Sequence, residues 1–177
     1  GAGAFFNFMP AENNLYGCEL DMKAYKVAKY LYPRANLVNG DIRSYQPSIR
    51  FDYVVGNPPY NLRWWVEDDE KTLSQLYYCW KAAELLKPFG ILAMIVPAAF
   101  LSDDFSDGAY IREMEERFSF LGHVALPANA FSFLGVWHYP VKLQFWQKRG
   151  EGLEAQPYHI KVDRFLTVGF DCVREAA

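Results

Sequence analysis

The order of apolar and polar positions divides the chain into short apolar runs and longer segments of helical period. Runs of strand length cover residues 15–20, 35–39, 51–56, 90–97, 120–126 and 141–147. Apolar residues recur at helical spacing over residues 21–31, 72–86 and 108–118. Because strands and helices alternate, we expect an α/β fold with a mostly parallel sheet.

The pattern weakens after Lys148. Glycines and Pro157 interrupt it, and two short strand-like pieces follow. We therefore expect one domain over residues 1–148 and a C-terminal extension of undefined structure over residues 149–177.

One predicted strand ends in an unusual way. Residues 54–61 read V-V-G-N-P-P-Y-N. Pro58 and Pro59 have no backbone N–H and stop the strand, and Asn57 is held extended by the proline that follows it. The sequence therefore predicts a rigid loop at a strand end, carrying Asn57 and Tyr60.

Composition and charge narrow the class of protein. The 177 residues are 51% hydrophobic and 22% charged, as in globular domains. The formal net charge is −3 and there is no long basic run. The chain therefore lacks the basic surface of a protein that binds nucleic acid through many phosphate contacts. The aromatic share of 18% fits either extra core mass or residues that line a groove or subunit contact.

The remaining composition argues against metal and membrane. Cys18, Cys79 and Cys172 lie far apart, which suits a reducing cytosol and gives no disulfide framework. The histidines share no ligand spacing with them, so we expect no metal. Residues 90–101 are too short an apolar run to span a membrane. We expect a cytoplasmic protein with no membrane partner.

Glycines and acids mark other predicted strand ends. Gly1 and Gly3 form a turn of the kind that lets backbone approach a ligand, although a plain turn would have the same sequence. Glu19 is placed to accept hydrogen bonds from ribose hydroxyls, and Asp41 from an exocyclic amine, at the sheet edge where ligands bind. Asp21 and Asp52 are alternatives, and a lone acid there often caps a helix or is solvated.

The order of these features resembles a known family. G-x-G-x-F at residues 1–5, E-L-D at 19–21, G-D-I at 40–42 and N-P-P-Y at 57–60 resemble the S-adenosylmethionine-dependent amino methyltransferases, within them the gamma-type N6-adenine DNA methyltransferases. The resemblance covers residues 1 to about 148 and implies a Rossmann-like sheet with an antiparallel last strand, in a bacterial or phage restriction–modification enzyme. It implies S-adenosylmethionine as cofactor, bordered by Gly1, Gly3, Phe5, Glu19, Leu20, Asp41, Ile42 and Asn57.

The resemblance also implies that Asn57, Pro58, Pro59 and Tyr60 form the catalytic loop. Hydrogen bonds from an adenine amine to the Asn57 side-chain oxygen and the Pro58 carbonyl would favour the pyramidal, attacking form of the amine. The prolines hold these acceptors rigid, and Tyr60 would stack on a base flipped out of the duplex. An ordinary proline turn is the alternative interpretation.

A second aromatic follows the same resemblance. The segment L-P-A-N-A-F at residues 126–131 resembles a late motif in which a Phe closes the base pocket from the other side. Phe131 is the best match and Phe133 the alternative, while a Phe packed in the core would look the same.

The sequence departs from the family at its start. Family members carry a strand before the glycine turn, and leaving out a central strand would leave two rows of backbone groups unpaired. We expect an N-terminal segment, another subunit or the tail to fill this place, and we do not expect activity from this chain alone. A region that recognises DNA would also lie outside these residues.

Other functions fit the same motifs. A protein-glutamine or RNA amino methyltransferase faces the same problem of a weakly nucleophilic nitrogen, although Phe5 and residues 126–131 favour DNA. A non-enzymatic interpretation is an inactive scaffold fragment of a larger modification enzyme. Binding of the methyl donor would separate an enzyme from a scaffold.

Overall fold

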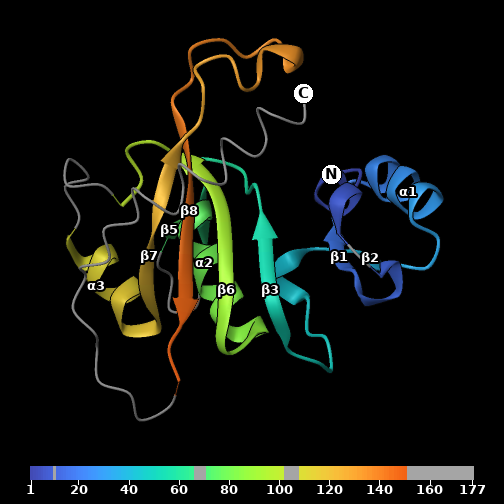
Figure 1. The fold of residues 1–177 in the computed structure, drawn as a ribbon, viewed down its shortest axis with the longest axis horizontal. Coiled ribbons are helices and arrows are strands. Elements are labelled where there is room, and N and C mark those ends of the chain that lie inside the picture. The colour runs from blue at the N-terminus through green and yellow to red at the C-terminus, as the bar shows by residue number, and fades with distance from the viewer. Residues whose placement is uncertain (10, 66–70, 102–107, 151–177) are drawn as a thin grey trace. The chain divides into compact units, whose positions relative to one another are not determined.

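The computed structural model describes residues 1–9, 11–65, 71–101 and 108–150 (Figure 1). The chain forms two compact units, Gly1–Ile49 and a second unit from Arg50 onward. Each unit has a sheet of its own. The predicted extension, apart from its first two residues, lies outside the described residues, and the boundary expected near residue 148 stays a prediction.

The first unit is a two-stranded parallel sheet with one connecting helix. Its elements are η1 (Ala4–Phe8), η2 (Glu12–Asn14), β1 (Tyr16–Glu19), α1 (Met22–Leu31), β2 (Asn36–Asn39) and η3 (Ile42–Ser44). The α1 helix begins where Asp21 caps it, because the Asp21 carboxylate accepts hydrogen bonds from the backbone N–H groups of Lys23 and Ala24 at 2.6 and 2.9 Å.

The second unit contains a four-stranded sheet and a small hairpin. Its elements are β3 (Phe51–Gly56), β4 (Arg63–Trp65), β5 (Lys71–Leu73), α2 (Ser74–Leu85), β6 (Leu86–Pro97), α3 (Gly108–Arg117), β7 (Phe118–Ala125), η5 (Ser132–Leu134) and β8 (Val141–Lys148). The strand order is β3-β6-β8-β7, with β3 parallel to β6.

The last strand is inserted and runs backwards, as predicted. β8 lies between β6 and β7 and is antiparallel to both. The other three strands point the same way, so the carboxyl ends of β3, β6 and β7 lie at one end of the sheet (Figure 1). The loop after β3 and the long connection from β7 to β8 both leave the sheet at this end. The predicted Rossmann-like class with an antiparallel last strand is confirmed.

The core of the second unit forms where α2 packs on the sheet. Alternate side chains of β6 are buried, and α2 covers them with its apolar face. The buried cluster comprises Leu76, Cys79, Ala82, Leu86, Leu92, Met94, Val96, Phe100, Leu101, Met114, Phe118 and Trp146. This core fixes the sheet end from which the candidate catalytic loop leaves.

Three predicted starts were wrong by two residues or more. The strand expected over residues 120–126 is Phe118–Ala125, because Phe118 and Ser119 also pair with β8. The helix expected over residues 72–86 begins at Ser74, because Lys71–Leu73 pairs with Arg63–Trp65 as a hairpin that local periodicity does not reveal. The strand expected to begin at Gly90 begins at Leu86, where pairing with Phe51 extends it past an irregular register. All three changes arise from pairing with distant residues.

The described helices are all short. None of those in the described ranges is long and apolar enough to cross a lipid bilayer.

Candidate functional site

The candidate catalytic loop leaves the carboxyl end of β3. Asn57 is exposed at the end of the strand, Pro58 is buried and Tyr60 is half-buried. The Tyr60 hydroxyl donates a short hydrogen bond to Asn57 Oδ1. The side-chain oxygen of Asn57 is therefore oriented to accept a hydrogen bond on the side of the loop where Tyr60 lies.

The first two residues of α2 form hydrogen bonds with this loop. The Ser74 hydroxyl donates to the Pro59 carbonyl at 2.6 Å. The Asn61 backbone N–H donates to Gln75 Oε1 at 2.9 Å, and Gln75 Nε2 donates to Asn61 Oδ1 at 3.0 Å. Ser74 and Gln75 are 0% and 1% exposed, whereas their partners Pro59 and Asn61 are exposed, so these hydrogen bonds are shielded from water on the side of α2.

A second aromatic ring lies on Tyr60. Tyr139, which comes just before β8, stacks on Tyr60 with the planes 7° apart and the ring centroids 5.9 Å apart. Partial burial, with a smaller contribution from the Tyr139 hydroxyl, raises the pKa of Tyr60 to about 12. Tyr60 is therefore a neutral hydroxyl at physiological pH, able to donate its hydrogen bond to Asn57.

A hollow opens beside these rings. It has a volume of about 220 Å³ and is lined by Asn61, Gln75, Pro97, Ala98, Ala99, Phe100, Tyr139 and Pro140. Its walls combine apolar surface with two side-chain amides and a phenol. Ligand pockets commonly pair an apolar lining with a few polar groups in this way, and drug-sized ligands need about 300–1,000 Å³. The size suits a small planar group.

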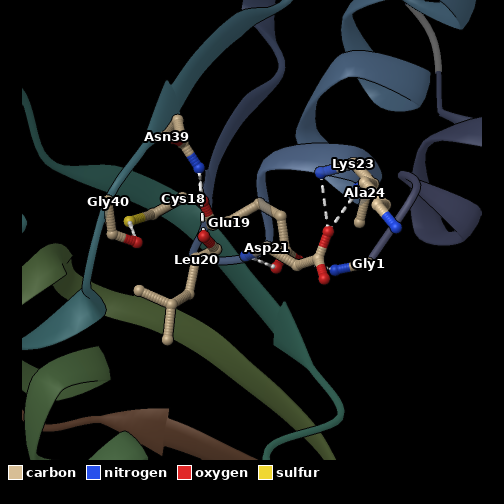
Figure 2. A network of polar contacts seen from close by, with 9 residues as sticks. All are labelled: Gly1, Cys18, Glu19, Leu20, Asp21, Lys23, Ala24, Asn39 and Gly40. Atoms are coloured by element: carbon tan, nitrogen blue, oxygen red, sulfur yellow. Dashed lines mark hydrogen bonds and ion pairs between the residues drawn. The ribbon is translucent and has the colours of Figure 1, made fainter.

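The first unit places the glycine turn against the end of β1. The Gly1 backbone nitrogen donates to the Glu19 carboxylate, which also accepts from the Asp21 backbone N–H at 2.7 Å (Figure 2). A small hollow of about 60 Å³ lies here, lined by Gly1, Gly3, Phe6, Gly17, Cys18, Glu19, Tyr25, Ala28, Leu37 and Val38. The structure thus brings Gly1, Gly3 and Glu19 together, and their contact with a cofactor stays a prediction.

Close backbone packing explains the glycines around this hollow. Gly3 has φ +85°, and a Cβ atom there would lie 2.8 Å from the Tyr32 ring. A Cβ atom on Gly17 would lie 2.9 Å from Leu37. Any larger residue would displace these neighbours. We call the backbone of Gly1, Gly3 and Gly17 around this hollow the glycine cradle, and its shape beside Glu19 depends on glycine.

The ends of β1 and β2 are tied together by polar contacts. Asn39 Nδ2 donates to the Glu19 carbonyl at 2.8 Å, and Cys18 Sγ donates to the Gly40 carbonyl at 3.2 Å (Figure 2). Burial raises the pKa of the Cys18 thiol above its ordinary value, with a smaller effect from Asp41. Cys18 is therefore a structural thiol rather than an activated nucleophile.

The other predicted cofactor residues of the first unit do not line this hollow, and their contact with a cofactor stays a prediction. The Asp41 carboxylate caps η3 and pairs with Arg43, whose side-chain hydrogen bonds hold its pKa below the ordinary value against the opposing effect of partial burial. Ile42 is the first residue of η3, and Leu20 is exposed. Phe5 is also exposed, whereas its neighbour Phe6 lines the hollow.

The alternative acids are explained by structure. Asp21 is the N-cap of α1, and Asp52 pairs with Lys87 at 2.9 Å. No group of three or more His, Cys, Asp or Glu side chains that could hold a metal occurs among the described residues.

Sequence reasoning missed several residues of the catalytic-loop region, namely Asn61, Ser74, Gln75 and Tyr139. Tyr139 sits in H-Y-P directly before a strand, and this aromatic-proline pair was a signal that could have identified it. Phe131, the predicted ring, lies at the start of η5, and its role in closing a base pocket stays a prediction. Gln75 had no local signal, because it reads as one polar residue in an amphipathic helix.

Known structures share this fold. A protein described as a class I S-adenosylmethionine-dependent methyltransferase from Listeria monocytogenes is 16% identical, with a TM-score of 0.64 over 82% of this chain and 47% of that one. A modification subunit of a type I restriction enzyme from Vibrio vulnificus is 17% identical, with a TM-score of 0.61 over 88% and 40%. An N-methyltransferase, NodS, from Bradyrhizobium japonicum in complex with S-adenosyl-L-homocysteine is 13% identical, with a TM-score of 0.53 over 77% and 67%.

This chain spans less than half the length of the Listeria and Vibrio proteins. A comparison with curated protein sequences gave no match. Residues 29–120, just over half of the chain, match the family of Eco57I restriction-modification methylases. That range includes the end of α1, the catalytic-loop segment and the start of α2. The chain therefore belongs to the Eco57I restriction-modification methylase family.

Proposed function

We propose that this chain is the catalytic part of an enzyme that methylates the exocyclic N6 amine of adenine in DNA, with S-adenosylmethionine as donor. The observation that carries the proposal is the Asn57–Tyr60 loop, fixed at the carboxyl end of β3 beside Tyr139 and a hollow of about 220 Å³. The reaction is direct methyl transfer to a base flipped out of the duplex, within a restriction–modification system.

The loop supplies oriented acceptors for the amine. The adenine amine is a poor nucleophile because its lone pair is delocalised into the ring. The amine would replace the Tyr60 hydroxyl on Asn57 Oδ1 and donate its other N–H to the Pro58 carbonyl. Because hydrogen bonds with Ser74 and Gln75 hold this loop, little reorganisation is needed as charge develops on the amine.

The two tyrosines supply a stacking surface for the base. Tyr60 and Tyr139 lie with nearly parallel planes, and aromatic faces of this kind stack on any unstacked base. For a base to enter between them the rings must separate, and the neighbouring hollow gives Tyr139 room to move. A flipped base, once unpaired, offers both faces to such a pair.

The residues of the first unit fit a nucleoside donor. The glycine cradle allows close approach of a ligand to the backbone, and the Glu19 carboxylate is a suitable acceptor for ribose hydroxyls. These hydroxyls would take the place of the Gly1 nitrogen on Glu19. When bound, S-adenosylmethionine supplies an electrophilic methyl group. The methyltransferase fold and the S-adenosyl-L-homocysteine complex of the Bradyrhizobium protein support this choice of donor.

Recognition of DNA would lie outside these residues. The net charge is −3, which does not suit a phosphate-gripping surface. Like the Vibrio subunit, which is a subunit of a larger restriction enzyme, this chain would act with further segments or subunits that bind DNA in the cytoplasm.

The test is methyl transfer by the intact protein. We expect labelled methyl groups from S-adenosylmethionine to reach adenine in mixed-sequence DNA, and Asn57→Ala to reduce the rate at least 100-fold, because a preorganised acceptor for developing charge is lost. Donor affinity, measured by calorimetric titration, separates a loss of catalysis from a loss of binding.

The same assay decides between the alternatives. Labelling of RNA or of a glutamine-containing protein, with DNA unlabelled, would replace DNA adenine as the substrate. Failure of the intact protein to bind the donor would overturn the enzymatic proposal and leave a scaffold.

A further inference from the structure

We propose that Gln75, together with Ser74, is a positioning residue that holds the Asn57–Asn61 loop in its reactive geometry. The inference rests on the proposed function for its kinetic consequence, while its structural part can be tested without activity. Neither residue belongs to the N-P-P-Y motif, and they are the first two residues of α2.

The contacts are specific to the loop. Gln75 binds Asn61 twice, accepting from its backbone N–H at 2.9 Å and donating to its side-chain oxygen at 3.0 Å. Ser74 binds the Pro59 carbonyl at 2.6 Å, one residue before Tyr60. Tyr60 is therefore held on both sides along the chain, since Pro59 and Asn61 flank it.

We call the hydrogen bonds of Ser74 and Gln75 with this loop the clamp. The backbone conformation of Asn61 shows what the clamp holds. Asn61 has φ +57°, in the left-handed region, which Asn adopts more readily than most residues with a Cβ atom, as a single residue whose polar side chain forms local hydrogen bonds. The turn at Asn61 directs the chain away from Tyr60 toward β4. The paired amide contacts with Gln75 hold Asn61 in this conformation, so Gln75 keeps Tyr60 beside Asn57 and Tyr139.

The Gln75 side chain is polar and yet fully buried, which is unusual for a glutamine. Gln75 is 1% exposed, and a buried amide without partners would be strongly destabilising. A shorter or apolar side chain would serve the helix equally well, since the neighbouring core positions of α2 are Leu76 and Cys79. The amide at position 75 is therefore explained by the loop rather than by the core.

The kinetic test uses the intact protein. Gln75→Met keeps the length of the side chain and removes both contacts with Asn61. We expect kcat for methyl transfer to fall roughly 10- to 100-fold, because displacement of a reacting group by about 1 Å has effects of this size, with donor KM changed less than 3-fold. Gln75→Glu keeps the acceptor for the Asn61 N–H, and a turn of the Asn61 amide lets its Nδ2 donate to the second carboxylate oxygen, so this variant should restore part of the rate.

A structural readout stands beside the kinetics. Hydrogen exchange at the Asn61 amide should quicken at least 10-fold in Gln75→Met, because its acceptor is gone, while amides in the middle of α2 keep their wild-type protection. Ser74→Ala should loosen the loop without removing the Gln75 contacts, and gives a smaller change in both readouts.

The control is Cys79→Ala, a buried position on the same helix that contacts Met94 rather than the loop. It lowers stability through the core and should leave kcat and Asn61 exchange unchanged. Equal losses of kcat in Cys79→Ala and Gln75→Met, or unchanged Asn61 exchange in Gln75→Met, would overturn the clamp. If Gln75→Met does not fold, Ser74→Ala decides by kcat: it should lower kcat while Cys79→Ala keeps the wild-type value, and equal kcat in these two variants would overturn the clamp. Wild-type protein that methylates nothing would refute the proposed function, while the exchange data still judge the clamp.

Discussion

The two units of this chain differ in how much apolar surface they bury. In the second unit, α2, α3 and the sheet enclose a continuous cluster that includes Phe118 and Trp146. Among the described residues of the first unit, the buried hydrophobic side chains are Leu15, Ala28 and Ala35, and α1 leaves Tyr30 85% exposed. With so few buried apolar side chains, the first unit has little hydrophobic stabilisation to offset the entropy of ordering its chain, whereas the second unit has a continuous core.

The candidate catalytic loop and the proposed donor site therefore lie on units that differ in their packing. The loop that must hold precise acceptors stands on the well-packed unit. The glycine cradle and Glu19, which we propose hold the donor, stand on a unit with little core of its own. We expect the first unit to depend on bound donor, or on chain segments outside this sequence, for its order.

The largest expected effect tests the core of the second unit. Trp146→Ala should lower the free energy of unfolding by about 3–5 kcal/mol, because the indole is buried against Phe118 and Phe120. Trp137→Ala, at an exposed position, should change it by less than about 0.5 kcal/mol. Urea unfolding of both variants gives the comparison. Similar losses for the two tryptophans would refute the packing difference that we describe.

Donor binding should act mainly on the first unit. At a donor concentration of 100 Kd, the bound state gains about 2.7 kcal/mol, and we expect the amides of β1, α1 and β2 to exchange more slowly. Hydrogen exchange with and without S-adenosyl-L-homocysteine measures this. Protection found in β6 and β8 with none in the first unit would contradict the proposed place of the donor.

A single methyl group should disturb the glycine cradle. Gly3→Ala forces a residue with a Cβ atom into φ +85° and against the Tyr32 ring, at a cost of about 1–2 kcal/mol. We expect donor affinity, measured by titration calorimetry, to fall about 10-fold. The matched control is Gly40→Ala, where the added atom would only touch Val38 at 3.8 Å. An equal loss of donor affinity in both variants would show that donor binding has no particular requirement for glycine at position 3.

The smallest effect is a dependence of stability on pH. Arg43 lowers the pKa of Asp41, so this pair stabilises the folded chain above the ordinary pKa of aspartate, and the contribution disappears as pH falls through the lowered value. Because the pair is partly exposed, we expect only a few tenths of a kcal/mol. Urea unfolding of the wild type and Asp41→Asn should differ at neutral pH and converge as the pH falls through the lowered pKa of Asp41. A difference that grows toward low pH would exclude the ion pair as its source.

The sequence by itself determined the local chemistry of this protein. The alternation of apolar runs predicted every described strand except β4 and β5, and the bounds of β3 were correct. The order of small, acidic and N-P-P-Y segments indicated the family and fold that the comparisons confirm. Asp21 was recognisable as a possible helix cap. These features depend on residues close together in the chain, since backbone preferences and caps act over a few positions.

Only the tertiary structure decided which distant side chains complete the site. Tyr139 reaches Tyr60 because β8 enters the sheet next to β6, and no local pattern specifies that strand order. Gln75 meets Asn61, 14 residues earlier, because the antiparallel pairing of β4 with β5 places the start of α2 beside the loop. A side chain's partner is set by how elements pack, and packing is a property of the whole sheet rather than of any segment.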